Sequence, residues 1–180
     1  MFTLTYWNLF AIISIAWVGV RIVFAAQNRN VDLLREVKLL TVYICIIVIA
    51  RIVYFPWHLE NGHIGVLHFD AQKILPLWVN VVPLVHLFDI YEGWQRNLFG
   101  NIAMFIPVGL AWPFCFKKLD GIGKVVLAGA GFSLLIELSQ LFFYERGSDI
   151  DDLITNTTGA LIGAVIYFLI IRVRKMIADR

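Results

Sequence analysis

The sequence predicts an all-α membrane protein, a bundle of five transmembrane helices with a re-entrant or interfacial segment on its outer face. Of the 180 residues, 60% are apolar and 16% are charged, whereas soluble domains have about 45–50% apolar and about 25% charged residues. The mean hydropathy is +0.79. Five apolar runs have the roughly 20 residues that a helix needs to cross a bilayer, and a helix satisfies its own backbone hydrogen bonds in lipid.

The composition also excludes several classes of protein. A soluble globule and a disordered chain do not fit this apolar content, and 15 Lys and Arg against 13 Asp and Glu leave a net charge of only +2, too little for a nucleic-acid binder. Two cysteines cannot form a disulfide framework. The first apolar run is too long for a signal peptide and has no basic residues before it. We therefore expect residues 1–180 to form a single transmembrane domain.

The spans are predicted in order along the chain. They cover residues 6–26, 37–57, 97–116, 122–144 and 153–171. A sixth apolar run, residues 74–90, is interrupted by Pro76 and Pro83, and proline removes a backbone donor and kinks a helix. Irregular backbone at membrane depth must be buried by protein or reached by water, so we expect this run to pack against the bundle without crossing.

The distribution of charge supports the same topology. Basic residues lie between spans one and two, between spans three and four, and in the C-terminal tail. All three groups can lie on the cytoplasmic side, where such residues belong, only if residues 74–90 do not cross. The N-terminus is then outside and the C-terminus inside. The inner side has eleven basic and four acidic residues, a net charge of +7, and the outer side has three basic and eight acidic residues, a net charge of −5.

Polar side chains recur near the outer ends of the predicted spans. Glu137 has Gln140 and Tyr144 three and seven residues later and Ser133 one turn earlier, which places all four on one helix face. The other positions are Arg51, Asn97, Asn101, Asp149, Asp152 and Asn156. We expect these faces to converge on one outward-facing pocket. Ionisable groups inside a membrane are costly and usually functional.

Structural roles for these residues stay open. Amide side chains in spans also join neighbouring helices, and Gly159 and Gly163 have the spacing of a close helix contact. Acidic residues at 149–152 can cap the fifth helix. A buried carboxylate needs a partner, so we expect Glu137 to pair with Arg51 or Arg146.

No metal site and no cofactor are predicted. His58, His63 and His68 are five residues apart, which is poor spacing for metal ligands on a helix, and the cysteine-containing zinc signatures are missing.

Several spaced motifs resemble the VanZ-like family. They are Asn97-x3-Asn101-x3-Phe105-x-Pro107-x-Gly109-x3-Pro113, Glu137-x2-Gln140, and Arg146-x2-Asp149-Ile150-Asp151-Asp152-Leu153-x2-Asn156-x2-Gly159. Upstream, Asn80-Val81-Val82-Pro83 resembles the family's Asn-Leu-x-Pro segment, although Leu84 stands where an aromatic residue usually follows. The resemblance covers about residues 80–167. It implies a bacterial protein of the inner membrane, in a family whose namesake is linked to resistance to teicoplanin, a lipoglycopeptide that binds cell-wall precursors.

These observations lead to one functional hypothesis and two alternatives. The first is that the pocket binds or modifies a cell-envelope lipid or its headgroup, with membrane lipids and lipid-linked cell-wall precursors as partners. Arg51, Arg96 and Arg146 could then hold an anionic headgroup, because arginine matches phosphate oxygens. The alternatives are an intramembrane enzyme acting on a lipid-linked phosphate, with Glu137 as acid or base, and a component of a small proton-coupled lipid transporter. The predicted binding residues are Arg51, Asn80, Asn97, Asn101, Glu137, Gln140, Arg146, Asp149, Asp152 and Asn156.

Overall fold

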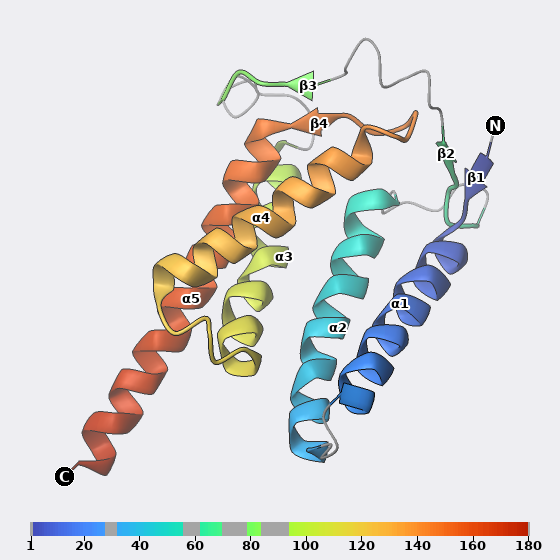
Figure 1. The fold of residues 1–180 in the computed structure, drawn as a ribbon. Coiled ribbons are helices and arrows are strands. Elements are labelled where there is room, and N and C mark those ends of the chain that lie inside the picture. The colour runs from blue at the N-terminus through green and yellow to red at the C-terminus, as the bar shows by residue number, and fades with distance from the viewer. Residues whose placement is uncertain (1, 28–31, 56–61, 70–78, 84–93, 180) are drawn as a thin grey trace.

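The five predicted helices are present in the computed structural model, which describes residues 2–27, 32–55, 62–69, 79–83 and 94–179 (Figure 1). They are α1 (Tyr6–Gln27), α2 (Leu33–Tyr54), α3 (Trp94–Cys115), α4 (Ile122–Gln140) and α5 (Ile150–Ala178). Each is long and apolar enough to cross a membrane. The described strands are β1 (Phe2–Leu4), β2 (Leu67–Phe69), β3 (Val79–Asn80) and β4 (Ser148–Asp149).

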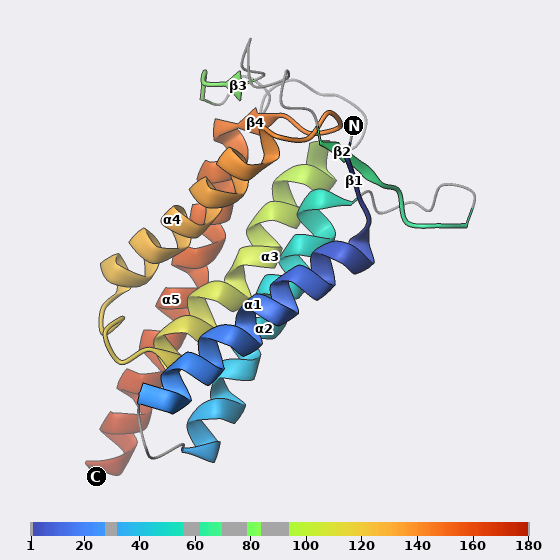
Figure 2. The same ribbon diagram turned by 45° about the vertical axis from the view of Figure 1, so that its right-hand side comes forward.

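The two ends of the bundle differ in structure. The four described strands lie at one end, which we call the strand end. The end of α1, the start of α2, the α3–α4 connection and the C-terminus lie at the other, which we call the tail end (Figure 1). α2 ends and α3 begins at the strand end (Figure 2). The chain between them therefore leaves and rejoins the bundle at the same end. Residues 74–90, which we expected to pack against the bundle without crossing, lie mostly outside the described residues. Of this run, residues 79–83 are described, and their strand β3 lies at the strand end.

Short strands tie distant parts of the chain together at the strand end. β1 pairs antiparallel with β2, and β3 pairs parallel with β4, so that Val79 lies opposite Ser148 and Asn80 opposite Asp149. This second pairing holds residues 79–83 against the start of α5.

The closest helix contact is between α3 and α5, and it depends on glycine. A Cβ atom added to Gly159 would lie 2.2 Å from the carbonyl oxygen of Ile102, and one added to Gly163 would lie 2.2 Å from that of Ile106. Gly109 in α3 lies against the same stretch of α5. The close packing predicted from the Gly159–Gly163 spacing is thus confirmed, and Phe105 and Val108 are fully buried beside it.

α1 is the most peripheral helix. It has no buried residue, so its apolar side chains are left for lipid to cover. Polar contacts that join it to α2 include the hydroxyl groups of Ser14 and Tyr43, which are 2.7 Å apart, and an ion pair between Arg21 and Glu36.

Several helices begin or end three or more residues away from the predicted spans, and local hydrogen bonds explain the differences. α2 begins at Leu33 instead of residue 37 because Asp32 caps it, accepting from the backbone N–H of Leu34 at 3.0 Å. α5 begins at Ile150 instead of residue 153 because Asp149 accepts from the N–H of Asp151 at 2.9 Å.

α4 ends at Gln140, not at residue 144. The chain turns there, and the N–H of Tyr144 donates to the carbonyl oxygen of His68 at 3.0 Å. Tyr144 is 66% exposed and has left the face that Ser133, Glu137 and Gln140 share. The predicted membership of that face is therefore correct for three residues and wrong for Tyr144.

Candidate functional site

The strand end brings most of the predicted site residues together. We call this set the polar layer. It comprises Asn80, Asn101, Ser133, Glu137, Gln140, Asp149, Asp152 and Asn156, contributed by β3, α3, α4, β4 and α5.

One chain of hydrogen bonds runs from β3 to the interior of the bundle. The side chain of Asn80 donates to Asp149 Oδ1 at 3.0 Å. The backbone N–H of Asp149 donates to Glu137 Oε2 at 2.8 Å. Glu137 is only 4% exposed, so the β3–β4 pairing and the cap of α5 together position a buried carboxylate in α4.

Two further hydrogen bonds connect the helices of the polar layer. Asn101 in α3 donates to Asp152 Oδ1 in α5 at 2.6 Å. One turn deeper, Asn156 in α5 donates to Ser133 Oγ in α4 at 2.9 Å, and Asn156 is 1% exposed. These contacts join neighbouring helices, which is the structural role left open for the amides, and the first of them holds Asp152 in place within the layer.

Gln140 faces α2, where its Nε2 donates to the carbonyl oxygen of Val53 at 3.5 Å. Within the part of the chain that the structure describes, Gln140 Oε1 and Asn156 Oδ1 are both buried without a hydrogen-bond partner. Such atoms are uncommon in folded proteins, because almost all buried polar groups are satisfied.

The expected pairing of Glu137 with Arg51 or Arg146 is wrong. Glu137 is hydrogen-bonded by the backbone N–H of Asp149 and by the side chain of Ser148. Arg146 instead donates from Nε and NH2 to the carbonyl oxygen of Tyr54, at 3.2 and 2.9 Å. Burial lowers the pKa of Arg146 from its usual value, although a guanidinium stays protonated in proteins.

Arg51 lies outside the polar layer. It donates to the carbonyl oxygen of Phe55 at 3.2 Å, and its guanidinium carbon is 5.8 Å from the centre of the Tyr6 ring. The carbonyl groups of the last helical turn have no partner within the helix and attract cations. This explains why both arginines are directed to the end of α2.

Asn97 and Arg96 lie one turn before Asn101, the residue that α3 contributes to the polar layer. Both are exposed, in the first turn of α3, whereas Asn101, one turn further along, reaches Asp152. The three arginines proposed to hold one anionic headgroup therefore lie at different places: Arg51 and Arg146 at the end of α2, and Arg96 at the start of α3.

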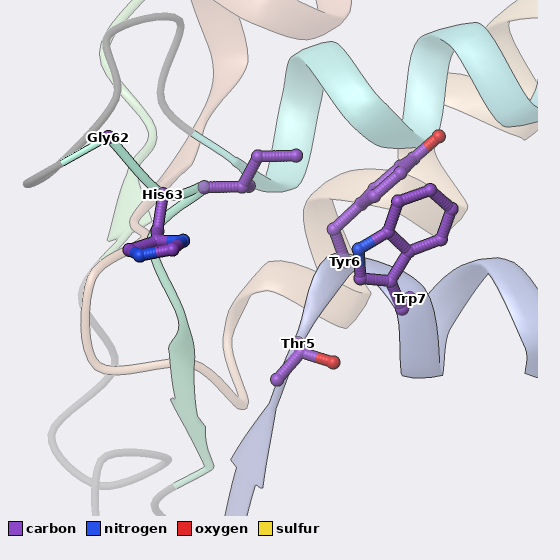
Figure 3. A pocket seen from close by; sticks show the side chains of 6 residues that line it. Thr5, Tyr6, Trp7, Gly62 and His63 are labelled. Carbon is purple, nitrogen blue, oxygen red and sulfur yellow. The ribbon is translucent and has the colours of Figure 1, made fainter.

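A cavity of about 340 Å³ opens at the strand end, beside the start of α1 (Figure 3). Thr5, Tyr6, Trp7, Gly62, His63 and Ile64 line it. None of them belongs to the polar layer. Gly62 has a φ of +79°, a backbone conformation that favours glycine. The sequence gives no signal for this cavity, because its lining segments are almost 60 residues apart and the β1–β2 pairing brings them together.

The described residues include no group of three or more His, Cys, Asp or Glu side chains arranged to hold a metal ion. His63 and His68 are described, whereas His58 lies outside the described residues.

A comparison with known families identifies the family of this chain. A family model described as VanZ/LLP1 matches residues 40–172. The chain belongs to the VanZ/LLP1 family. The match confirms the resemblance suggested by the motifs and extends it upstream into α2, so that the whole polar layer lies in the VanZ/LLP1 region.

Among curated proteins, the chain is similar to Protein VanZ of Enterococcus faecium, with 35% identity over 74 residues. The alignment covers 41% of this chain and 45% of that relative. The chain thus spans less than half the length of the curated relative it matches. No solved structure matches it.

Proposed function

We propose that this VanZ/LLP1 protein binds the polar headgroup of a cell-envelope lipid in the polar layer. The observation that carries the proposal is the hydrogen-bonded chain Asn80–Asp149–Glu137, which brings a buried carboxylate to the strand end of a membrane helix. Ionisable residues within membrane spans are rare and mark functional sites. Through such a lipid, the protein would alter the sensitivity of a bacterium to lipoglycopeptides such as teicoplanin.

The strand end would face the outside of the inner membrane in this proposal. The tail end carries the basic residues that favour the cytoplasmic side. They include Lys117 and Lys118 between α3 and α4, and Arg172, Arg174 and Lys175 near the end of α5. α5 extends beyond α3 and α4 at this end in both views (Figure 2). A headgroup of the outer leaflet would therefore meet the polar layer.

Lipid binding can be tested with the full chain purified in mild detergent. Native mass spectrometry would compare the lipids that it retains with the lipids of the membrane from which it came. We expect selective retention of one lipid class and a loss of about tenfold or more in Asp152→Asn, because a hydrogen bond to a charged group contributes about 1.5–3 kcal/mol.

Asp120→Asn is the matched control, since it makes the same chemical change at the exposed tail end of the bundle. Retention that mirrors the bulk membrane, or equal loss in both variants, would contradict the proposal.

The same preparation separates binding from catalysis and transport. A binding protein leaves its lipid unchanged. An intramembrane enzyme would release a new lipid product, and Glu137→Gln would abolish product formation while retention survives. A proton-coupled carrier would move lipid in reconstituted vesicles only under a pH gradient.

A further inference from the structure

The polar layer contains the carboxyl groups of Glu137, Asp149 and Asp152, joined to their surroundings by hydrogen bonds. Asp149 and Asp152 both lie close enough to Glu137 to repel its carboxylate. In the described part of the chain, none of these three carboxylates forms an ion pair. Arg146 attracts Asp152 but donates two hydrogen bonds to the carbonyl oxygen of Tyr54.

The amide nitrogens around these carboxylates are already engaged. Asn80 donates to Asp149 and Asn101 donates to Asp152. Asn156 donates to Ser133, and Gln140 donates to the carbonyl oxygen of Val53. Each of the four amides therefore has a partner for its nitrogen.

Among the described residues, the buried side-chain atoms of the polar layer that have no hydrogen-bond partner are acceptors. Gln140 Oε1 and Asn156 Oδ1 are without a partner among the described residues, in side chains that are 5% and 1% exposed. An unsatisfied buried polar atom costs about 1–3 kcal/mol. Two such atoms in one layer point to a ligand that supplies hydrogen-bond donors.

The positions of these two oxygens connect them to the carboxylates. Gln140 follows Glu137 by three residues on the buried face of α4. Asn156 follows Asp152 by one turn of α5, and it bonds Ser133, which precedes Glu137 by one turn of α4. Gln140 therefore lies one turn beyond Glu137 along α4, and Asn156 in α5 contacts the residue that lies one turn before it.

We propose that the polar layer binds a primary ammonium group, such as the one in the headgroup of phosphatidylethanolamine. This rests on the proposed function, because it names the group recognised at that site. An ammonium group has one positive charge and three donors and no acceptor, which complements carboxylates and unpartnered carbonyl oxygens. A phosphate in the same place would meet carboxylates of like charge.

The test uses the full chain in mild detergent, mixed with equal amounts of phosphatidylethanolamine, its N-acetyl derivative and phosphatidylglycerol. EDTA removes divalent cations, and native mass spectrometry measures the lipid retained. We expect at least tenfold preference for phosphatidylethanolamine over the N-acetyl derivative, since acetylation removes the charge and two donors. Asp152→Asn and Gln140→Leu should each reduce this preference to less than threefold, and Asp120→Asn should leave it unchanged.

The outcomes distinguish this proposal from the function on which it rests. Equal retention of phosphatidylethanolamine and its N-acetyl derivative would overturn the ammonium proposal and leave lipid binding standing. Retention of no lipid would refute the proposed function and this inference with it. A preference that appears only when Mg²⁺ replaces EDTA would show a metal-bridged headgroup and would also overturn the ammonium proposal.

A final arm distinguishes the sources of the ammonium group. Free ethanolamine that displaces the lipid at millimolar concentration would support recognition of the ammonium group alone. Failure of ethanolamine to compete, with the lipid preference intact, would support recognition of the group only within a lipid.

Discussion

Replacing Gly163 with alanine should destabilise the contact between α3 and α5. The new Cβ atom would lie 2.2 Å from the carbonyl oxygen of Ile106 and 2.9 Å from the Cα atom of Gly109. Close carbon–oxygen contacts between helices are normally about 3.3 Å or longer. The two backbones would have to separate by about 1 Å, and overpacking of this kind costs about 1–3 kcal/mol.

Gly131→Ala is the matched control. Gly131 lies in the middle of α4, and a Cβ atom added to it would meet nothing within 4 Å. Both substitutions gain the same helix propensity of roughly 1 kcal/mol. The difference between the two variants therefore isolates the interhelical contact.

The assay is the free energy of unfolding in mixed micelles, measured by circular dichroism as the fraction of sodium dodecyl sulfate rises. We expect Gly163→Ala to be less stable than Gly131→Ala by about 1–3 kcal/mol. Gly159→Ala should resemble Gly163→Ala, since its Cβ atom would lie 2.2 Å from the carbonyl oxygen of Ile102. Equal stability of all three variants would refute the close approach of α3 and α5.

Three further predictions concern the loops and the topology. Arg146→Lys should lose about 1.5 kcal/mol in the same assay, because one ammonium nitrogen replaces the two nitrogens that reach the Tyr54 carbonyl. Partial burial works to raise the pKa of Glu145, but hydrogen bonds from the backbone and ring of His68 outweigh it and hold that pKa below its ordinary value of 4.5. This contact therefore stabilises β2 above about pH 4.5 and is lost as the pH falls through the lowered pKa. Hydrogen-exchange protection of the amides of residues 67–69 should decrease over the same pH range in the wild type. In Glu145→Gln, this protection should stay low at all pH values. A reporter that works only in the cytoplasm should be active when it is fused to the C-terminus. Activity of a reporter that works only after export would contradict the proposed orientation.

The number of spans could be predicted because hydropathy is a local property. Each span has enough apolar residues in sequence to cross a membrane, whatever its neighbours are. The ends were less predictable, because they depend on single hydrogen bonds. Asp32 and Asp149 add a turn to α2 and α5, and the bond from Tyr144 to His68 is formed with a strand more than 70 residues away.

The candidate site was predictable only as far as helix periodicity extends. The spacing of Ser133, Glu137 and Gln140 places them on one face, and all three are buried. Their partners depend on how the helices dock. The partner expected for Glu137 was a guanidinium, whereas the structure supplies a backbone N–H from β4. A search for oppositely charged side chains cannot find such a partner, because every residue except proline carries the same backbone donor.

Asp149 has three structural roles that belong to different elements. Its side chain caps α5 and accepts from Asn80 in β3, and its backbone N–H donates to Glu137 in α4. Any movement of residues 79–83 that breaks the β3–β4 pairing would remove a partner from Asp149 and change the field at Glu137. If breaking the pairing weakens ligand binding at Glu137, a ligand bound there favours the paired position of β3 to the same extent, since linkage between two sites is reciprocal. Asp149 is therefore the residue through which β3 contacts the carboxylate proposed to hold the headgroup.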